Sequence, residues 1–175
     1  LEEPANSVIG VSRSPEYKDF FLPYKQRSTK QFQFHQIDLV HQFAELTRLL
    51  DQVKAQVVIN VAALSEVNLS NERPVEYFET NTLSVVKLCN FLRGRSYLER
   101  YVHISSAEIF GNCEAPATEE TCFNPSTAYA TSKAAAELYL NTLVRNFDFP
   151  ALVIRTTNVY GKHQQLYKII PRTLI

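Results

Sequence analysis

The chain has 175 residues, of which 45% are hydrophobic and 21% charged, a composition typical of one soluble globular domain with its own core. Its length is too short for two domains of ordinary size. Lys plus Arg and Asp plus Glu number 18 each, so the formal net charge is zero, and we expect neither nucleic acid nor an anionic membrane as a partner.

Short runs rich in β-branched residues alternate along the chain with longer amphipathic segments. In chain order, the predicted strands are Ser7–Val11, Gln33–Ile37, Val57–Val61, Tyr101–Ser105 and Ala151–Arg155. The predicted helices between them are His41–Lys54, Val75–Leu92 and Ala128–Asn146. Alternation at this spacing indicates right-handed βαβ crossovers. We therefore predict an α/β fold with a doubly wound parallel sheet of the Rossmann-like kind.

Polar residues follow the predicted strands, at the edge where parallel sheets of this class bind their ligands. Asp38, after the second strand, is also placed to cap the first helix. The polar groups, in strand order, are Ser12-Arg13-Ser14, Asp38, Ser65-Glu66, Ser106 with Glu108, and Thr156-Thr157-Asn158. This layout is typical of a nucleotide-binding sheet.

The glycine-rich turn that usually opens such a fold is absent from the sequence. That turn lets the backbone approach a pyrophosphate, whereas the four glycines here are scattered. Either the first βα unit lies outside this sequence, or the chain has another fold. The chain contains no methionine and so does not begin at a native start codon. We expect a fragment that lacks the first unit.

The sequence carries no pattern for membrane insertion, export or metal binding. Its longest apolar run, Val57–Leu64, is interrupted by Asn60 and is far too short to span a bilayer. The first ten residues lack the basic-then-apolar order of a signal peptide. The three cysteines have no CxxC spacing and fit reduced thiols better than disulfides or a zinc site. We expect a cytoplasmic protein without a metal.

Tyr129 and Lys133 lie four residues apart in the third predicted helix, which places a phenol and an ammonium on one face. A free tyrosine has a pKa of about 10, and a nearby cation lowers it by roughly 1–3 units. Tyrosinate can then accept the proton of an alcohol when hydride leaves for a nicotinamide. The alternative interpretation is a chance pair.

Two neighbouring features support this interpretation. A hydroxyl of Ser105 or Ser106, at the end of a strand, can hydrogen-bond the reacting oxygen. Asn81 lies in the middle of a helix, where an amide is slightly unfavourable and therefore suggests a use. The alternatives are ordinary hydrogen bonding at a strand end and an amide that faces solvent.

Two charged residues suggest further chemistry. Glu108 follows Ser106 by two residues, where a carboxylate can remove a carbon-bound proton next to a carbonyl; the alternative is a solvated surface glutamate. Arg13 lies between two serines where this fold binds the adenosine ribose. A guanidinium matches a 2′-phosphate, so NADP is favoured over NAD. The alternative is a surface arginine, with Glu16 or Asp19 serving the ribose of NAD.

Several motifs occur in an order that resembles the extended short-chain dehydrogenase/reductases that modify nucleotide sugars. They are Val61-Ala-Ala63, Asn81, Ser105-Ser-Ala-Glu-Ile-Phe-Gly111, Tyr129-Ala-Thr-Ser-Lys133 and Arg155-Thr-Thr-Asn-Val-Tyr-Gly161. The resemblance runs from about Val8 to the C-terminus. It implies that residues 1–161 form a dinucleotide-binding domain without its first βα unit. Residues 162–175 would begin a substrate-binding region, most of which is missing.

The resemblance also implies site residues and partners. Tyr129 would be the base for the sugar C4 hydroxyl, Lys133 would hold the nicotinamide ribose, and Ser106 would contact the C4 oxygen. The expected cofactor-binding residues are Ser12, Arg13, Asp38, Leu39, Val61, Ala62, Ala63, Asn81, Tyr129 and Lys133. The expected substrate-binding residues are Ser65 and Asn158. Relatives of this kind act on a nucleotide sugar and form homo-oligomers, and we expect the same here.

The segment Ser106-Ala107-Glu108 points to the subtype. Glucose-type sugar-nucleotide 4,6-dehydratases carry Thr-Asp-Glu here, whereas GDP-mannose 4,6-dehydratases lack the aspartate and keep the glutamate. The resemblance thus implies an NADP-dependent 4,6-dehydratase of the GDP-mannose kind, which makes a 4-keto-6-deoxy sugar. Glu66 stands where dehydratases usually carry histidine. The open alternatives are a 4-epimerase, which needs no such glutamate, an NDP-uronate decarboxylase, and a non-catalytic NADP-binding regulatory protein.

Overall fold

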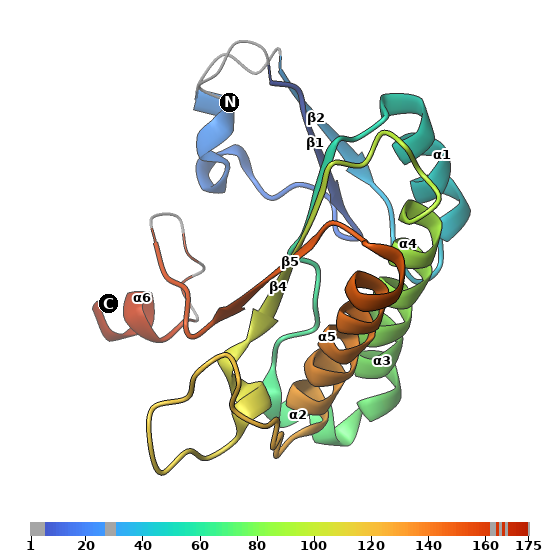
Figure 1. Ribbon diagram of the computed structural model, residues 1–175. Helices are drawn as coiled ribbons and strands as arrows, with labels where there is room; N and C mark the ends of the chain where they lie inside the picture. The colour runs from blue at the N-terminus through green and yellow to red at the C-terminus, as the bar shows by residue number, and fades with distance from the viewer. Residues whose placement is uncertain (1–5, 27–30, 162–163, 165, 167, 175) are drawn as a thin grey trace. The chain divides into compact units, whose positions relative to one another are not determined.

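The structure is a computed structural model that describes residues 6–26, 31–161, 164, 166 and 168–174. The chain divides into two compact units. The first comprises residues 1–38 and 158–175, and the second comprises residues 39–157. Each unit is described by itself below, with the element labels of Figure 1.

The first unit contains a two-stranded parallel sheet. Strand β1 (Val8–Ser12) pairs with β2 (Phe32–Gln36), with Val8 opposite Phe32. A Cβ at Gly10 would lie 2.7 Å from the far end of the Phe32 ring, so a larger residue at this position would require that ring to shift. The remaining elements are the short 3₁₀ helices η1 (Asp19–Phe21) and η2 (Pro23–Gln26), and helix α6 (Ile169–Leu174).

The second unit is built on a three-stranded parallel sheet in the order β3-β4-β5. Its strands are β3 (Val57–Asn60), β4 (Arg100–Ser106) and β5 (Ala151–Thr156). Each of the five predicted strands forms within one residue of its expected bounds, and each pairs in parallel as expected.

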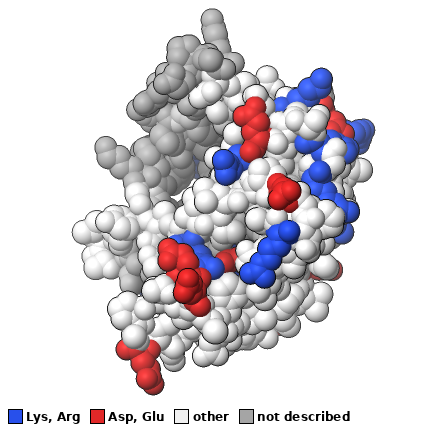
Figure 2. All heavy atoms as spheres, viewed as in Figure 1, with Lys and Arg blue, Asp and Glu red and all other residues white. Residues whose placement is uncertain are grey.

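Helices cover one face of this sheet (Figure 1). The longest is α5 (Ala128–Phe147), which packs against β4 and β5; the others are α1 (Phe43–Val53), α2 (Val67–Glu72), α3 (Pro74–Phe78) and α4 (Ser84–Leu92). Acidic and basic side chains lie interspersed on the side of the molecule in view, in keeping with the zero net charge (Figure 2).

The core of the second unit lies between β4 and the helices. Alternate residues of β4 point inward, so that Tyr101, His103 and Ser105 are buried. Leu140 of α5 and Leu92 of α4 are completely buried as well. The sheet also carries apolar side chains that are exposed to solvent, among them Ile59, Leu152 and Ile154.

The helical segment predicted at Val75–Leu92 forms, but it is not a regular α-helix. A π-helical stretch, η3 (Glu79–Leu83), separates α3 from α4 and has the buried Asn81 at its centre. Such π turns insert a residue into the helical ladder and often lie at functional sites. Periodicity in the sequence could not show this turn, because the apolar spacing on both sides remains helical.

Two local predictions need correction. Helix α1 begins at Phe43 with Gln42 as its N-cap and no side-chain capping hydrogen bond, so Asp38 does not cap it. Helix α2 was not expected. It has only six residues, and a segment so short has no periodicity that distinguishes it from a loop.

We predict that Gly111→Ala destabilises the protein by about 2 kcal/mol or more. Gly111 has a φ of 63°, and an added Cβ would lie 2.1 Å from the backbone oxygen of Asn124. Gly94→Ala is the matched control, because its nearest neighbour would be 3.9 Å away. We expect Gly94→Ala to be neutral or stabilising by up to about 1 kcal/mol. Urea unfolding of both variants would measure the contrast, and equal stabilities would contradict it.

Candidate active site

Ser106 and Glu108 lie at the end of β4, where the strand passes into a 3₁₀ helix, η4 (Ala107–Phe110). Ser106 is the N-cap of η4, and its Oγ accepts a hydrogen bond from the backbone N–H of Glu108 at 3.2 Å. Phe110 is buried while the side chain of Glu108 is exposed. The local fold thus anchors the turn in the core and leaves its carboxylate accessible.

Tyr129 is the second residue of α5 and lies in its first turn. The helix N-cap is Thr127, whose Oγ1 accepts a hydrogen bond from the backbone N–H of Ala130 at 3.1 Å. Tyr129 is partly buried, and its ring packs edge-on against Tyr77, with 6.5 Å between ring centroids. This edge contact and the cap fix the place of the ring at the start of the helix.

Two polar residues at the end of β4, Ser106 and Glu108, act on the pKa of Tyr129. Burial raises the pKa of Tyr129, a hydrogen bond with Ser106 lowers it, and the charge of Glu108 raises it. The structure therefore brings Tyr129, Ser106 and Glu108 together. The expected lowering of this pKa by Lys133 is wrong, because the net shift is upward and Lys133 is not among its causes.

Lys133 points into the core beneath Tyr129. Its side chain is only 2% exposed, its Nζ donates a hydrogen bond to the Ile104 carbonyl at 2.6 Å, and it lies 3.5 Å from His103 Nε2. Burial lowers the pKa of Lys133 to about 8, although the charge of Glu137 opposes this shift. Both contacts hold the ammonium against β4.

Both the oxygen and the nitrogen of the Asn81 side-chain amide form hydrogen bonds within the protein. Its Oδ1 accepts from the Leu64 backbone N–H at 2.8 Å, while its Nδ2 donates to the Leu64 carbonyl and to Ser132 Oγ, both at 3.0 Å. These bonds tie the segment after β3, which includes Val61, Ala62 and Ala63, to helix α5. The small side chains of the alanines leave the backbone of this segment approachable. A contact between Asn81 and the cofactor stays a prediction.

The remaining predicted site residues are divided between the two units. Leu39 and Ser65 belong to the second unit, together with the residues described above. The first unit contains Ser12, Arg13, Asp38 and Asn158. Arg13 is exposed directly after β1, and its backbone carbonyl accepts a hydrogen bond from Gln36 Nε2 at 3.0 Å. Their roles at a cofactor or substrate stay predictions.

His103 is a site neighbour that the sequence reasoning missed. It is buried beside Lys133, and burial, followed by the charge of Lys133, lowers its pKa to about 3, so the ring is neutral. Its Nδ1 has no hydrogen-bond partner among the described residues. The available signal was a histidine at an inward-facing position of a predicted strand, two residues before Ser105.

The described part of the chain contains neither a membrane-spanning helix nor a metal-binding cluster. No helix there is long and apolar enough to cross a membrane. No group of three or more His, Cys, Asp or Glu side chains in the same residues could hold a metal ion.

We predict that Lys133→Met raises the free energy of unfolding of the full-length protein at about pH 7 by roughly 1–3 kcal/mol. The folded pKa of about 8 lies below the ordinary value of 10.5, so the unfolded chain binds more protons between these two values. Wild-type stability therefore rises with pH across that window. The advantage of the variant should shrink accordingly.

Urea unfolding at about pH 7 and about pH 9.5 would measure this effect. Lys87→Met is the matched control, because Lys87 is exposed on α4 and its replacement relieves no burial of charge. A Lys133→Met variant that is less stable than wild type at both pH values would contradict the prediction.

Comparison with known proteins gives consistent matches. The model of the NAD dependent epimerase/dehydratase family matches residues 1–175. The chain is 32% identical over 131 residues to a dTDP-D-glucose 4,6-dehydratase of Mus musculus, covering 74% of this chain and 37% of that protein. It is 31% identical over 132 residues to a dTDP-glucose 4,6-dehydratase of Mycobacterium tuberculosis, covering 72% of this chain and 39% of the relative.

Solved structures show the same fold. A dTDP-glucose 4,6-dehydratase from Streptomyces venezuelae, with NAD and TYD bound, superposes with a TM-score of 0.83 at 24% identity. That match covers 97% of this chain and 52% of the other, so the chain spans about a third to a half of the length of these relatives. The prediction of a Rossmann-like α/β fold is confirmed. The chain belongs to the NAD-dependent epimerase/dehydratase family.

Proposed function

We propose that the full-length protein is an NADP-dependent nucleotide-sugar 4,6-dehydratase. The observation that carries this proposal is the meeting of Tyr129, Ser106 and Glu108 at the end of β4. A base for an alcohol and a second base for a carbon-bound proton therefore lie in one place, and a dehydratase needs both.

Tyr129 and its neighbours perform the first step. A bound nicotinamide cofactor would supply the acceptor for hydride from sugar C4 and the donor of hydride to C6. Tyr129 takes the proton of the C4 hydroxyl, and Ser106 holds the same oxygen by a hydrogen bond. Burial raises the pKa of Tyr129, so the hydrogen bond with Ser106, which lowers this pKa, favours the proton transfer.

Glu108 performs the elimination. The ketone at C4 acidifies C5, and Glu108 removes the C5 proton while the C6 hydroxyl leaves and takes up a proton to form water. Return of a proton to C5, with the hydride that a bound cofactor would supply at C6, would leave a 4-keto-6-deoxy sugar. Ala107 has no proton to give to the leaving hydroxyl, so this proton must come from solvent or from Glu108 itself.

Two observations bear on which nucleotide the substrate carries, and a third bears on the cofactor. Ala107 in place of an aspartate supports a GDP-mannose-like substrate. The named relatives act, by their names, on dTDP-glucose, which makes a dTDP-hexose the second candidate. The exposed Arg13, with serines on both sides after β1, supports NADP as the cofactor because a guanidinium matches a 2′-phosphate.

A 4-epimerase is the second candidate function, and Ala107 favours it. An epimerase re-reduces the C4 ketone on its other face and needs neither an acid at residue 107 nor a base at Glu108. The proposed dehydratase needs Glu108, so this carboxylate separates the two functions.

Mass spectrometry of products would test the proposal directly. The full-length protein would be supplied with GDP-, dTDP-, UDP- and CDP-hexoses, each with NADP and with NAD. Loss of one water from a sugar supports the dehydratase and identifies its nucleotide and cofactor. A product of unchanged mass with an inverted C4 would establish the epimerase instead.

We predict that Glu108→Gln slows loss of water by about 10²–10⁴-fold and leaves C4 oxidation nearly unchanged, because only the C5 base is removed. Reduced cofactor should then accumulate and be visible by its absorbance. Tyr129→Phe is the comparison variant, and it should slow both steps while the protein stays folded. If Glu108→Gln eliminates water at the wild-type rate, Glu108 has no role in the reaction.

A further inference from the structure

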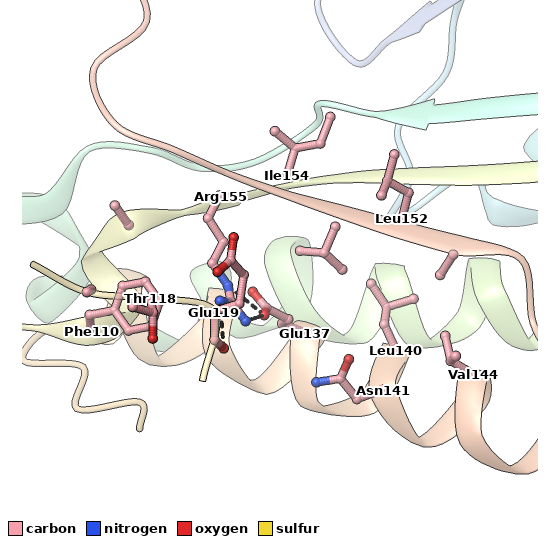
Figure 3. A pocket seen from close by; sticks show the side chains of 14 residues that line it. Phe110, Thr118, Glu119, Glu137, Leu140, Asn141, Val144, Leu152, Ile154 and Arg155 are labelled. Atoms are coloured by element: carbon pink, nitrogen blue, oxygen red, sulfur yellow. Dashed lines mark hydrogen bonds and ion pairs between the residues drawn. The ribbon is translucent and has the colours of Figure 1, made fainter. Parts of the chain in front are cut away.

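An ion pair between the partly exposed Arg155 and the buried Glu137 joins helix α5 to strand β5 beside a pocket of about 690 Å³ (Figure 3). Arg155 of β5 donates from Nε to Glu137 Oε1 of α5 at 2.9 Å, and its Nη2 donates to the same oxygen. Glu137 is 1% exposed. Figure 3 shows the guanidinium directed from the strand towards this carboxylate.

The other side of the guanidinium faces the segment that follows β4. Its Nη1 donates a hydrogen bond to the backbone carbonyl of Glu119 at 3.2 Å. Its Cζ lies 5.1 Å from the ring centroid of Phe110 and 5.2 Å from that of Phe123. These two rings also contact each other edge-on, at 6.0 Å. One side chain of β5 therefore contacts the segment at three points.

This segment carries Glu108 at its beginning. Phe110 is the last residue of η4, and Glu108 lies two residues before it. The far end returns to the same turn, because the backbone N–H of Asn124 donates to the Ile109 carbonyl at 2.9 Å. Fixing Phe110 and Phe123 together therefore fixes the turn from which the Glu108 side chain emerges.

The chemistry of the pair indicates a role in orientation. A buried ion pair seldom stabilises a fold more than apolar side chains of the same size would. A planar guanidinium with donors in fixed directions, however, sets the orientation of the groups it contacts, which an apolar side chain cannot do. Placing a reacting group to within about 1 Å is worth about 100-fold in rate.

We propose that Arg155, held by Glu137, is a positioning residue that keeps η4 in the orientation in which Glu108 reaches the C5 proton. The inference rests on the proposed function for its chemical part. Arg155 is the residue to change, because Glu137 also acts on the charge of Lys133 and its replacement would disturb two groups.

The test compares Arg155→Met and Arg155→Lys in the full-length protein, following C4 oxidation by reduced-cofactor absorbance and elimination by loss of water. Arg155→Met should slow elimination by about 100-fold and change C4 oxidation by less than about threefold. Arg155→Lys keeps the charge but not the fork of donors, so its loss should be intermediate, at about tenfold.

Arg95→Met is the matched control. Arg95 also forms an arginine–carboxylate pair beside an aromatic ring, but with the exposed Asp51: its Nε and Nη2 lie 2.7 and 3.1 Å from the carboxylate, and its Cζ lies 3.9 Å from the ring centroid of Phe91. It belongs to the turn after α4 and ties that turn to α1, so both partial reactions should keep their wild-type rates.

Hydrogen–deuterium exchange provides a readout that does not depend on the reaction. Peptides from residues 107–124 should exchange faster in Arg155→Met than in wild type, and Arg95→Met should leave them unchanged. Phe123→Leu keeps both partners of the ion pair but removes the ring that lies 5.2 Å from the Arg155 guanidinium, so it should reproduce both the faster exchange and the selective loss of elimination.

Two results would overturn the inference. One is unchanged exchange over residues 107–124 in Arg155→Met, whatever the reaction proves to be. The other is an equal loss of C4 oxidation and elimination in a variant that remains folded. If the wild-type protein removes no water from any sugar, the proposed function fails. Faster exchange in Arg155→Met would then still support the inference that Arg155 holds η4 in place.

Discussion

The ammonium of Lys133 lies between α5 and β4, where the Ile104 carbonyl accepts its hydrogen bond at 2.6 Å and burial lowers its pKa to about 8. A charge in this place is costly, and the surrounding structure compensates for it only in part. The neutral ring of His103 lies beside it, and Glu137 follows one turn later on the same helix. Stability and site chemistry therefore compete at this one residue.

Helix α5 carries the other groups on which the site depends. Tyr129 and Lys133 lie in its first two turns, and between them Ser132 connects through Asn81 to the segment after β3. One turn beyond Lys133, Glu137 holds Arg155 and, through it, the turn that carries Glu108. A rigid helix of 20 residues thus sets the spacing between two site segments that come from different strands.

The strands and the two long regular helices could be predicted from the sequence because apolar periodicity is a local property. The five strands formed within one residue of their expected bounds, and α5 did so as well. The π turn at Asn81 and the short helix α2 were missed, since both depend on what the segment packs against. The expected shift of the Tyr129 pKa had the wrong direction, because burial outweighs the hydrogen bond from Ser106.

The sequence by itself determined the alternation of strands and helices, the helical spacing of Tyr129 and Lys133, and the order of motifs that identifies the family. The first two are fixed by residues close together in the chain, and the third by the order of short motifs along it. Only the tertiary structure decided that Lys133 faces His103 and Ile104, that Asn81 holds Leu64, and that Arg155 reaches Glu137 and Phe110. These contacts join residues far apart in sequence, and burial, which sets the charges of the site, exists only once the chain has folded.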